Sequence, residues 1–579
     1  MHEHARAVAR AVMRAAKPID NFAFGSHDAW PLVRCKPDVT AVVPYRRRAA
    51  TRKGPVMAIA DFFDRGWRSN PNGVAFIAGD QSFTYQAIGA MSCRVANALR
   101  AQGFAPETKG AVLAPNDPMA WACVLGLWRA GLAWVPLNPA NPPEDTHRLL
   151  DGFDCEVLFA HEKLLPVIQK LRPSLPQLST VVVLGAETEV AATADAITLE
   201  AFVENASTDR PDYTPDPEAV AGIMPTGGTT GAPKGVMNTH RSLSVSTVHT
   251  MLASPYESDD AIVNLVAAPM THTAGILTLP CSARGGTVVV MARPDPVGLL
   301  DLIEKHRVTE LFLPPTVIYR LLEVPGIEKR DFSSLKYLMY GAAPMSTEKL
   351  RRAIEVFGPV MFQGYGQTEA PSGIAYLRPH EHFKNGQIAD AFRLSAAGRP
   401  APLVWVEVMD DNGEILPQGE VGEICVRGDL VMKGYYKAPD KTAETIVDGW
   451  LHTGDIGMVD EEGFVHITDR KKDMIISGGF NVYPSEVEQV IWSHPAVQEC
   501  AVIGVPHPDW GEAVTAFVEL NEGAGVTEED LLAFCRERLG GIRTPKELNI
   551  VTDLPRSPTG KVLKKDLREP YWSGHERSI

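Results

Sequence analysis

The pattern of hydrophobic and polar positions becomes regular from about residue 57 onward. Residues 57–67 carry apolar side chains at helical spacing, residues 74–85 alternate around a Gly-Asp turn, and residues 85–103 form a long helical stretch that ends at a glycine. We interpret this order of helix, hairpin and helix as the entry to a folded domain.

Short apolar strands then alternate with helical segments. The predicted strands are residues 110–116, 155–160, 180–185, 221–226, 262–269, 285–292, 310–315, 335–343 and 358–366. Strand, loop and helix repeated in this way predict an α/β fold, in which parallel sheets carry helices on their faces.

Parallel sheets bind ligands at the carboxyl ends of their strands, where the connecting loops converge. Four polar or glycine-rich segments follow predicted strands, at residues 225–235, 268–275, 341–344 and 364–370. We therefore expect these four loops to share one rim.

The pattern of hydrophobic and polar positions changes twice toward the C-terminus. Beyond about Arg399, alternating strands surround Asp-Asn-Gly turns, which predicts an antiparallel β subdomain. After Asp469 a helix, two strands and a second helix predict a small α+β unit. The expected organisation is an N-terminal extension of unknown role (1–56), a large domain (57–470) and a small C-terminal domain (471–579).

Composition limits the partners. The 579 residues exceed one ordinary core, so about two to four domains are expected. The net charge of −15 divides into +7 over residues 1–53 and −22 over the remainder, and a strongly acidic body disfavours nucleic acid. The basic cluster at 46–53 is typical of a solvated tail, with an anionic membrane or a phosphorylated ligand as the alternative.

The cysteines and the most apolar run bear on the compartment. The eight cysteines lack C-x-x-C spacing, which argues against a zinc site or a disulfide framework and suits a reducing compartment. The apolar run at 120–137 is interrupted by Arg129 and by glycines, so it predicts a buried helix and strand rather than a membrane span. No secretory signal is visible, and we expect a cytoplasmic protein.

The stretch PTGGTTGAPK at 225–234 combines three glycines, three threonines and a lysine. Glycines let a backbone turn its N–H groups toward a ligand, threonines add hydroxyl donors and lysine adds charge, so the pattern indicates a polyphosphate site. A surface turn is the alternative. The spacing fits neither the P-loop nor the GxGxxG dinucleotide motif.

Seven motifs in this order resemble the acyl-activating (AMP-forming adenylate) superfamily, closest to stand-alone acyl-CoA synthetases. They are residues 225–236, 268–275, 341–344, 364–370, 452–455, 469–488 and 555–561, and the resemblance extends from about residue 57 to 569. It implies two half-reactions. A carboxylate attacks the α-phosphate of ATP to give an acyl-adenylate and pyrophosphate, and the thiol of coenzyme A then displaces AMP, with the small domain rotating between the two.

The resemblance also assigns the nucleotide contacts. It implies a phosphate loop of Thr226, Gly227, Gly228, Thr229, Thr230, Gly231 and Lys234. It further implies an adenine site of Gly341, Ala342, Ala343, Gly364, Tyr365 and Gly366, ribose contacts from Asp455 and Arg470, a hinge at Lys472, and a pantetheine channel along Gly478 and Gly479. The chain departs from the family at Gly227, usually Ser, which removes a hydrogen bond of about 1.5–3 kcal/mol. A tight turn between two strands is the alternative for Gly478 and Gly479.

Four residues are implied in catalysis. Lys561 matches the lysine that reaches the carboxylate and the α-phosphate, and Thr368 matches a hydroxyl beside that phosphate. Glu369 matches a Mg²⁺ ligand, because an acidic side chain beside a polyphosphate requires a cation. A helix-capping surface glutamate is its alternative. His272 matches a gate and wall between the acyl pocket and the thiol channel.

The substrate is predicted only by class. The loop at 268–275 lacks the aspartate of amino-acid-activating relatives, and no carrier domain follows residue 569, so we expect a stand-alone ligase. Small residues (Ala274, Gly275, Gly341, Ala342, Ala343 and Gly364) are interpreted as space for a bulky fatty, aromatic or polycyclic acid. The alternatives are an adenylating amide synthetase, a carrier-protein ligase and a non-catalytic nucleotide-binding protein. The expected partners are the acid, ATP with Mg²⁺, and coenzyme A, with a homodimer as one assembly to test.

Overall fold

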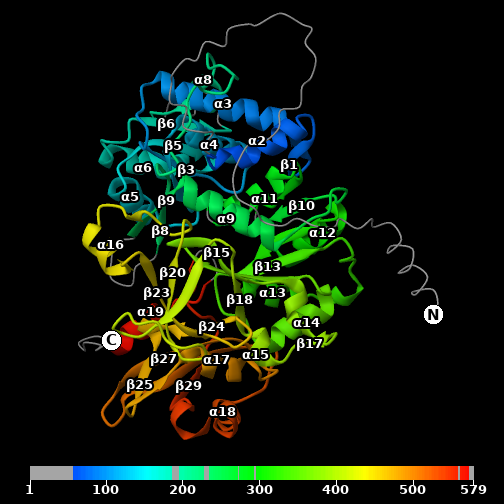
Figure 1. Cartoon of the computed structure of the whole chain (residues 1–579), viewed down its shortest axis with the longest axis vertical. Helices are drawn as coiled ribbons and strands as arrows, with labels where there is room; N and C mark the ends of the chain where they lie inside the picture. The colour runs from blue at the N-terminus through cyan, green and yellow to red at the C-terminus, as the bar shows by residue number, and fades with distance from the viewer. Residues whose placement is uncertain are drawn as a thin grey trace, which may run out of the picture. The chain divides into compact units, whose positions relative to one another are not determined.

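The computed structural model describes residues 57–185, 195–226, 234–271, 273–292, 295–557 and 561–572. The predicted extension 1–56 thus lies outside the described residues. Within them, sheets of fourteen, eight, five and two strands are packed with helices (Figure 1). The expected α/β class is confirmed. No helix in these described ranges is long and apolar enough to cross a membrane.

The eight-stranded sheet has the order β21-β9-β8-β4-β3-β5-β6-β7. Strands β3 to β8 run parallel, whereas β9 turns back antiparallel on β8 and pairs with β21. The bounds are β3 Lys109–Leu113, β4 Ala133–Leu137, β5 Cys155–His161, β6 Thr180–Leu184, β7 Ile197–Thr198, β8 Val220–Thr226, β9 Lys234–Thr239 and β21 Gly434–Tyr435.

The fourteen-stranded sheet is parallel in one half and antiparallel in the other. The parallel half contains β1 Val74–Ala78, β10 Val263–Val266, β11 Thr287–Val290, β12 Glu310–Leu313, β13 Tyr337–Gly341 and β14 Met361–Gln367. The antiparallel half contains β15 Ala370–Leu377, β18 Ala396–Pro400, β19 Trp405–Met409, β20 Gly422–Arg427, β22 Ile446–Val447, β23 Trp450–Val459 and β24 Val465–Arg470. The predicted hairpin at 74–85 is confirmed, because β2 (Gln81–Thr84) pairs antiparallel with β1.

The helices that cover these sheets include α2 Ala60–Ser69, α3 Tyr85–Ala101, α4 Pro118–Ala130, α9 His240–Ala253, α12 Pro296–His306, α13 Pro315–Leu322 and α14 Thr347–Phe357. Helix α4 shows why the local sequence folds as it does. The side chain of Asp117 accepts hydrogen bonds from the first-turn N–H groups of Met119 and Ala120, and Gly131, at φ 87°, ends the helix.

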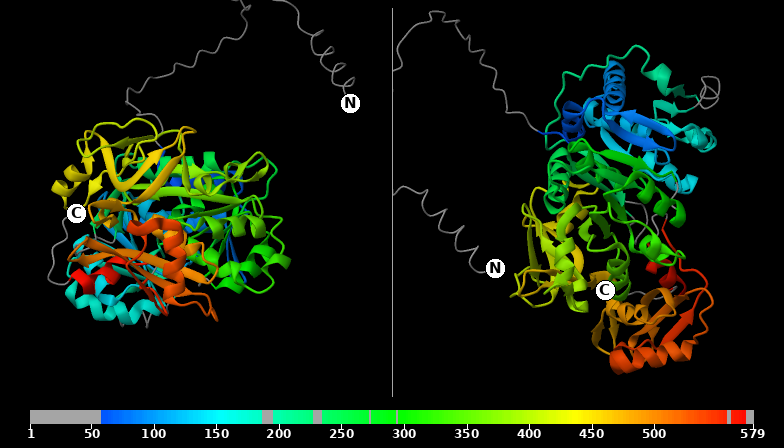
Figure 2. Two further views of the ribbon diagram at one scale, coloured as in Figure 1. Left: turned by 90° about the horizontal axis from the view of Figure 1, so that it is seen from below. Right: turned by 90° about the vertical axis from the view of Figure 1, so that its right-hand side faces the viewer.

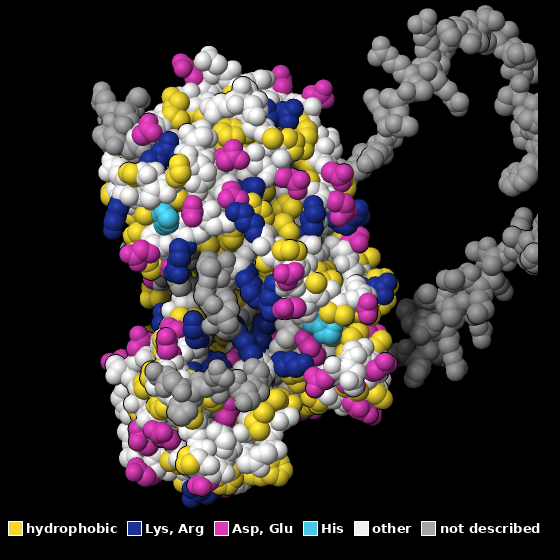
Figure 3. Space-filling view, turned by 90° about the vertical axis from the view of Figure 1, so that its left-hand side faces the viewer, with side chains coloured by type: hydrophobic (Ala, Val, Ile, Leu, Met, Phe, Trp, Pro, Cys, Tyr) yellow, Lys and Arg dark blue, Asp and Glu magenta, His cyan; other side chains and the backbone are white. Residues whose placement is uncertain are grey.

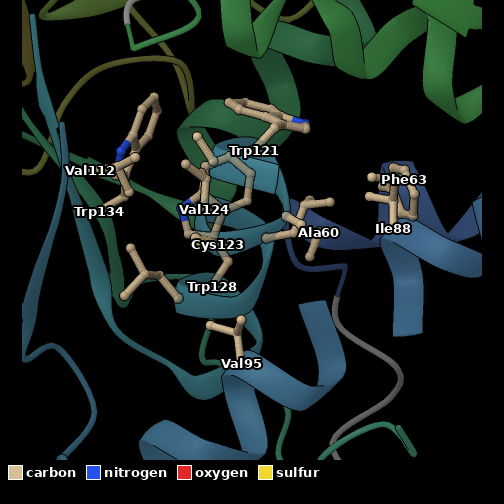
Figure 4. Close-up of a cluster of buried hydrophobic side chains, with 14 of the residues drawn as sticks. Ala60, Phe63, Ile88, Val95, Val112, Trp121, Cys123, Val124, Trp128 and Trp134 are labelled. Atoms are coloured by element: carbon tan, nitrogen blue, oxygen red, sulfur yellow. The ribbon is translucent and has the colours of Figure 1, made fainter. Parts of the chain in front are cut away.

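The predicted buried helix and strand at 120–137 are confirmed as α4 and β4. Trp121 and Trp128 of α4 and Trp134 of β4 form a triangle of edge-to-face rings, with centroids 5.7, 5.8 and 5.9 Å apart (Figure 4). All three indoles are buried in the largest apolar cluster. Because α4 is covered on nearly every side, its sequence is apolar all round rather than on one stripe.

The C-terminal α+β unit is confirmed in its elements, and Figure 2 shows it, coloured orange to red, as a lobe of its own. It contains β25 Ile475–Ser477, β26 Phe480–Val482, α17 Pro484–Trp492, β27 Val497–His507, β28 Gly511–Leu520, α18 Glu528–Arg543, β29 Glu547–Ile550 and α19 Lys564–Trp572. The long β27–β28 hairpin is its centre, and α17 packs on β27.

Two sequence interpretations are corrected. The four loops do not leave one sheet, because β10, β13 and β14 belong to the fourteen-stranded sheet while β8 belongs to the other. The segment at 364–367, predicted both as the end of a strand (358–366) and as the start of a loop (364–370), is the end of β14, so only Thr368 and Glu369 form the turn into β15. The first error concerns how strands pair across long sequence distances, which local periodicity does not encode.

The described cysteines lie in the protein interior. The seven cysteines among the described residues, Cys93, Cys123, Cys155, Cys281, Cys425, Cys500 and Cys535, are free and buried.

Candidate active site

The backbones of β13 and β14 pack closely against each other at the ends of the two strands, and we call this surface the backbone floor of the candidate site. Gly341 lies opposite Gly364 in the parallel register, and a Cβ on Gly341 would come within 2.4 Å of the Gly364 carbonyl oxygen. The next residue, Ala342, has φ 65°, in the left-handed region that side chains other than glycine rarely adopt. Such strain is typical of a functional turn.

A buried polar pair stands beside this floor. The hydroxyl of Tyr365 donates to Asp455 Oδ2 at 2.7 Å, and Arg470 Nε lies 2.7 Å from Asp455 Oδ1. Asp455 on β23 and Arg470 on β24 are directly paired in the antiparallel register. Burial raises the pKa of Asp455 even though Arg470 opposes the shift. The predicted adenine and ribose residues are thus brought together by three strands of one sheet.

The turn formed by Thr368 and Glu369, which we call the acidic turn, connects the fourteen-stranded sheet to the eight-stranded sheet. Asn238 Nδ2 on β9 donates to the Thr368 carbonyl oxygen at 3.1 Å, and the Tyr435 hydroxyl on β21 donates to Glu369 Oε1 at 2.8 Å. The ammonium of Lys234 lies 5.2 Å from the centre of the Tyr435 ring, within cation–π range. The end of the predicted phosphate loop therefore lies beside the predicted metal ligand, although they belong to different sheets.

Glu369 fits a magnesium ion that is shared with phosphates. Across the described ranges, no three His, Cys, Asp or Glu side chains come together as a metal cage. Mg²⁺ keeps several waters and is commonly held by one or two carboxylates together with substrate phosphates, so a single half-buried carboxylate is a sufficient protein contribution.

Five cations from three segments influence one another electrostatically. The pKa of Lys561 is lowered by burial and by the nearby positive charges of Arg470 and Lys472, although its side chain keeps contact with solvent. The pKa of Lys472 is lowered by burial and then by Arg470, Arg568 and Lys234. On the face of the protein drawn in Figure 3, Lys and Arg side chains gather around a hollow. Mutually repelling cations of this kind favour a polyanionic ligand.

Two reciprocal hydrogen bonds between Ser557 and Lys561 fix the segment that carries Lys561. Lys561 N donates to Ser557 Oγ at 3.1 Å, and Ser557 N donates to the Lys561 carbonyl oxygen at 2.8 Å. Asp455 and Asp473 raise the pKa of Lys561, against the larger lowering effects. The predicted catalytic lysine therefore lies within electrostatic reach of the predicted ribose contact.

Gly478 and Gly479 form the tight turn between β25 and β26, at φ 59° and 81°. A Cβ on Gly478 would come within 2.8 Å of the Trp510 ring, whereas nothing lies within 4 Å of the same position on Gly479. The alternative interpretation, a glycine turn joining two strands, thus describes the local structure, and a role in a thiol channel stays a proposal.

Several predicted residues lie outside the described residues, namely Gly227, Gly228, Thr229, Thr230, Gly231 and His272. Thr226 lies at the end of β8, paired with Lys234 in the antiparallel register. Tyr435 and Asn238 were missed by sequence reasoning. No local pattern distinguishes them, because each reaches the acidic turn only through the pairing of β9 with β8 and β21.

The argument that small residues leave space for the substrate is wrong at two positions. A Cβ on Gly275 would come within 2.1 Å of the Met270 carbonyl oxygen and 2.6 Å of the Trp121 ring, and Gly341 is filled by the neighbouring strand. Gly364 alone among the three glycines has room, with nothing nearer than 3.6 Å. Close packing of protein, rather than of ligand, therefore explains two of these glycines.

The fold and these groups define a nucleotide-using enzyme of the adenylate-forming class. The family model described as AMP-binding enzyme matches residues 63–436, and that of the AMP-binding enzyme C-terminal domain matches residues 486–561. The chain belongs to the AMP-binding enzyme family, and the resemblance drawn from the seven motifs is confirmed.

Individual relatives agree with this membership. A feruloyl-CoA synthase of an Amycolatopsis species is 36% identical over 508 residues, 87% of this chain and 97% of the relative. The medium/long-chain-fatty-acid–CoA ligase FadD8 of Mycobacterium tuberculosis is 40% identical over 370 residues, 63% of each chain. The solved amide bond synthetase McbA from Marinactinospora thermotolerans superposes with a TM-score of 0.79 at 32% identity, covering 89% of this chain and 100% of that one. The chain is an AMP-forming acid–thiol ligase that uses ATP.

Proposed function

We propose that the enzyme adenylates a bulky hydrophobic carboxylic acid (fatty, aromatic or polycyclic) and transfers the acyl group to coenzyme A. The convergence of Lys234, Arg470, Lys472 and Lys561 around the Tyr365–Asp455 pair and Glu369 carries this proposal. The names of the relatives support the acid class, because one acts on fatty acids and another is a feruloyl-CoA synthase.

In the first half-reaction, a carboxylate oxygen attacks the α-phosphorus of ATP and pyrophosphate leaves. We assign Tyr365 and the Gly341–Ala343 turn to the adenine and Asp455 to the ribose. Lys234 then faces the outer phosphates. Two unit charges at about 4 Å repel by about 4 kcal/mol at an effective dielectric near 20, and the Lys561 ammonium offsets this as the oxygens approach. A magnesium ion at Glu369 would supply further neutralisation of the phosphates.

In the second half-reaction, the thiol sulfur attacks the acyl carbon, the bond to AMP breaks and the thiol proton passes to solvent. The adenylate is already activated, so a thiol of modest pKa needs little help from a base. We assign the approach path to the Gly478–Gly479 turn, brought to the site by rotation of residues 471–579, with His272 as the gate.

Carboxylate-dependent exchange of pyrophosphate into ATP tests the proposal. A panel running from acetate to long-chain, aromatic and polycyclic acids should support exchange with acids of about eight or more carbons. Preference for acetate or propionate would exclude the bulky-acid assignment. Loss of exchange on chelation of Mg²⁺, restored by adding it back, tests the requirement for the metal.

The acceptor is a separate question, because the amide bond synthetase likeness favours an amine as the second candidate. Product analysis with coenzyme A, an amine or a carrier protein as the added acceptor distinguishes them. A thioester that forms only with coenzyme A supports the ligase proposal, whereas an amide formed without it supports the synthetase. A non-catalytic nucleotide-binding protein would show no exchange with any acid.

A further inference from the structure

One side chain of the C-terminal unit binds the backbone just beyond the Gly341–Ala343 turn, which we call the adenine wall because it is assigned to the adenine. Gln489 on α17 accepts a hydrogen bond from Thr347 N at 3.2 Å and donates one to the Met345 carbonyl oxygen at 3.0 Å. Met345 follows directly on the Gly341–Pro344 segment. A single carboxamide therefore fixes both a donor and an acceptor of the same short stretch.

The same stretch is fixed from the other side by the large domain. The hydroxyl of buried Tyr319 on α13 accepts from Ser346 N at 2.7 Å. The ammonium of Lys349 lies 4.4 Å from the centre of the Tyr319 ring and donates to the Gln498 carbonyl oxygen on β27. Met345 to Lys349 thus form the junction at which helix α14 of the large domain meets α17 and β27.

Helix α17 also holds the segment that follows the predicted catalytic lysine. Glu488, next to Gln489, accepts from Lys564 at 2.7 Å, and Lys564 is three residues beyond Lys561. Neighbouring residues of one helix are therefore connected to two parts of the candidate site: Glu488 to the lysine segment and Gln489 to the adenine wall.

We propose that Gln489 is a positioning residue that couples the orientation of the C-terminal unit to the grip of the adenine wall on the nucleotide. The inference rests on the proposed function. Both hydrogen bonds belong to one side chain, so any rotation of the unit that withdraws α17 breaks them together. The wall then loses two partners when adenylation is complete, which favours release of AMP after thioester formation. By linkage, a bound nucleotide favours the docked orientation to the same degree.

Substitution of Gln489 by Leu tests this coupling, because leucine keeps much of the volume and removes both hydrogen bonds. The matched control is Gln498→Ala, since Gln498 contributes only its backbone carbonyl to the recorded contact with Lys349. In pyrophosphate exchange, Gln489→Leu should raise the KM for ATP about 5- to 160-fold, as expected for two lost hydrogen bonds. The KM for the acid and thioester formation from supplied acyl-adenylate should stay within about twofold, and Gln489→Asn should recover part of the loss.

Binding of AMP to the intact chain, measured by calorimetry, gives a second reading that needs no knowledge of the acid. Gln489→Leu should weaken the binding of AMP about 5- to 160-fold relative to wild type and to Gln498→Ala. An unchanged AMP affinity and KM for ATP would overturn the coupling, and so would equal losses in both half-reactions with a lowered melting temperature. Failure of the proposed function is separate, because the wild type itself would then show no acid-dependent exchange.

Discussion

Lys564 Nζ lies 2.7 Å from Glu488 Oε1, and this ion pair fastens the segment beyond Lys561 to helix α17. Glu488 is buried, and its Oε1 also accepts from Val502 N at 2.8 Å. Burial raises the pKa of Glu488, while the carboxylates around Lys564 raise that of the lysine above its ordinary value despite burial. Both shifts mark a pair taken largely out of water.

Breaking this pair should destabilise the C-terminal unit. Lys564→Met leaves the Glu488 carboxylate buried without its cation, so we expect a loss of about 3–5 kcal/mol in the free energy of unfolding. The neighbouring Lys565 is exposed, and Lys565→Met should change stability by no more than about 0.5 kcal/mol. Denaturant unfolding of both variants measures the difference. Equal stabilities would show that the pair contributes little.

Removal of the Lys561 ammonium should separate the half-reactions. Lys561→Ala is expected to lower adenylation at least about 10²-fold through loss of one preorganised charge, while thioester formation from supplied acyl-adenylate is largely kept. Lys565→Ala is the control. Since the pKa of Lys561 is lowered, adenylation by the wild type should begin to fall on the alkaline side below the ordinary lysine value. Equal loss in both half-reactions would contradict the rotation scheme.

The ring and the hydroxyl of Tyr365 should have separable effects. Tyr365→Phe removes the hydrogen bond to Asp455, which is typically about 0.5–1.5 kcal/mol, and keeps the ring. Tyr365→Ala also removes the proposed stacking on adenine, which is about 1–3 kcal/mol per base. We therefore expect the KM for ATP to rise less than about 13-fold in the first variant and distinctly further in the second. Equal KM values would exclude stacking.

Paired glycine variants test the packing of the backbone floor. Gly341→Ala places a Cβ within 2.4 Å of the Gly364 carbonyl oxygen, so it should force β13 and β14 apart and cost about 1–3 kcal/mol. Gly364→Ala meets nothing nearer than 3.6 Å and should fold as the wild type does. Thermal unfolding of the two variants compares them. A Gly341→Ala protein as stable as Gly364→Ala would show that the strands adjust without cost.

The sequence predicted individual helices and strands better than it predicted which strands pair with one another. Alternation around Gly79–Asp80 and the apolar run at 120–137 were sufficient for a hairpin and a buried helix with its strand, because both are local. The separation of β8 from β10, β13 and β14 into another sheet depends on long-range pairing. For the same reason neither Tyr435 nor Gln489 could be found, since each acts through a contact between segments far apart in sequence.

A buried histidine should make the protein sensitive to acid. His382 is fully buried, its Nδ1 lies 2.9 Å from the Arg378 carbonyl oxygen and its Nε2 lies 2.9 Å from the Tyr340 hydroxyl, an arrangement that suits a neutral ring. Burial lowers the pKa of His382 from 6.5 to about 4. Between these values the unfolded chain binds a proton that the folded chain does not. The contribution of His382 to the free energy of unfolding is therefore complete above pH 6.5 and falls as the pH decreases, by up to about 1.4 kcal/mol per pH unit.

His382→Gln removes this pH-dependent difference. The gap in the free energy of unfolding between this variant and the wild type should therefore shrink by about 3 kcal/mol between pH 7 and pH 4. Denaturant unfolding across this range measures the gap, and a gap that stays constant would show that the pKa of His382 is the same in the folded and the unfolded chain.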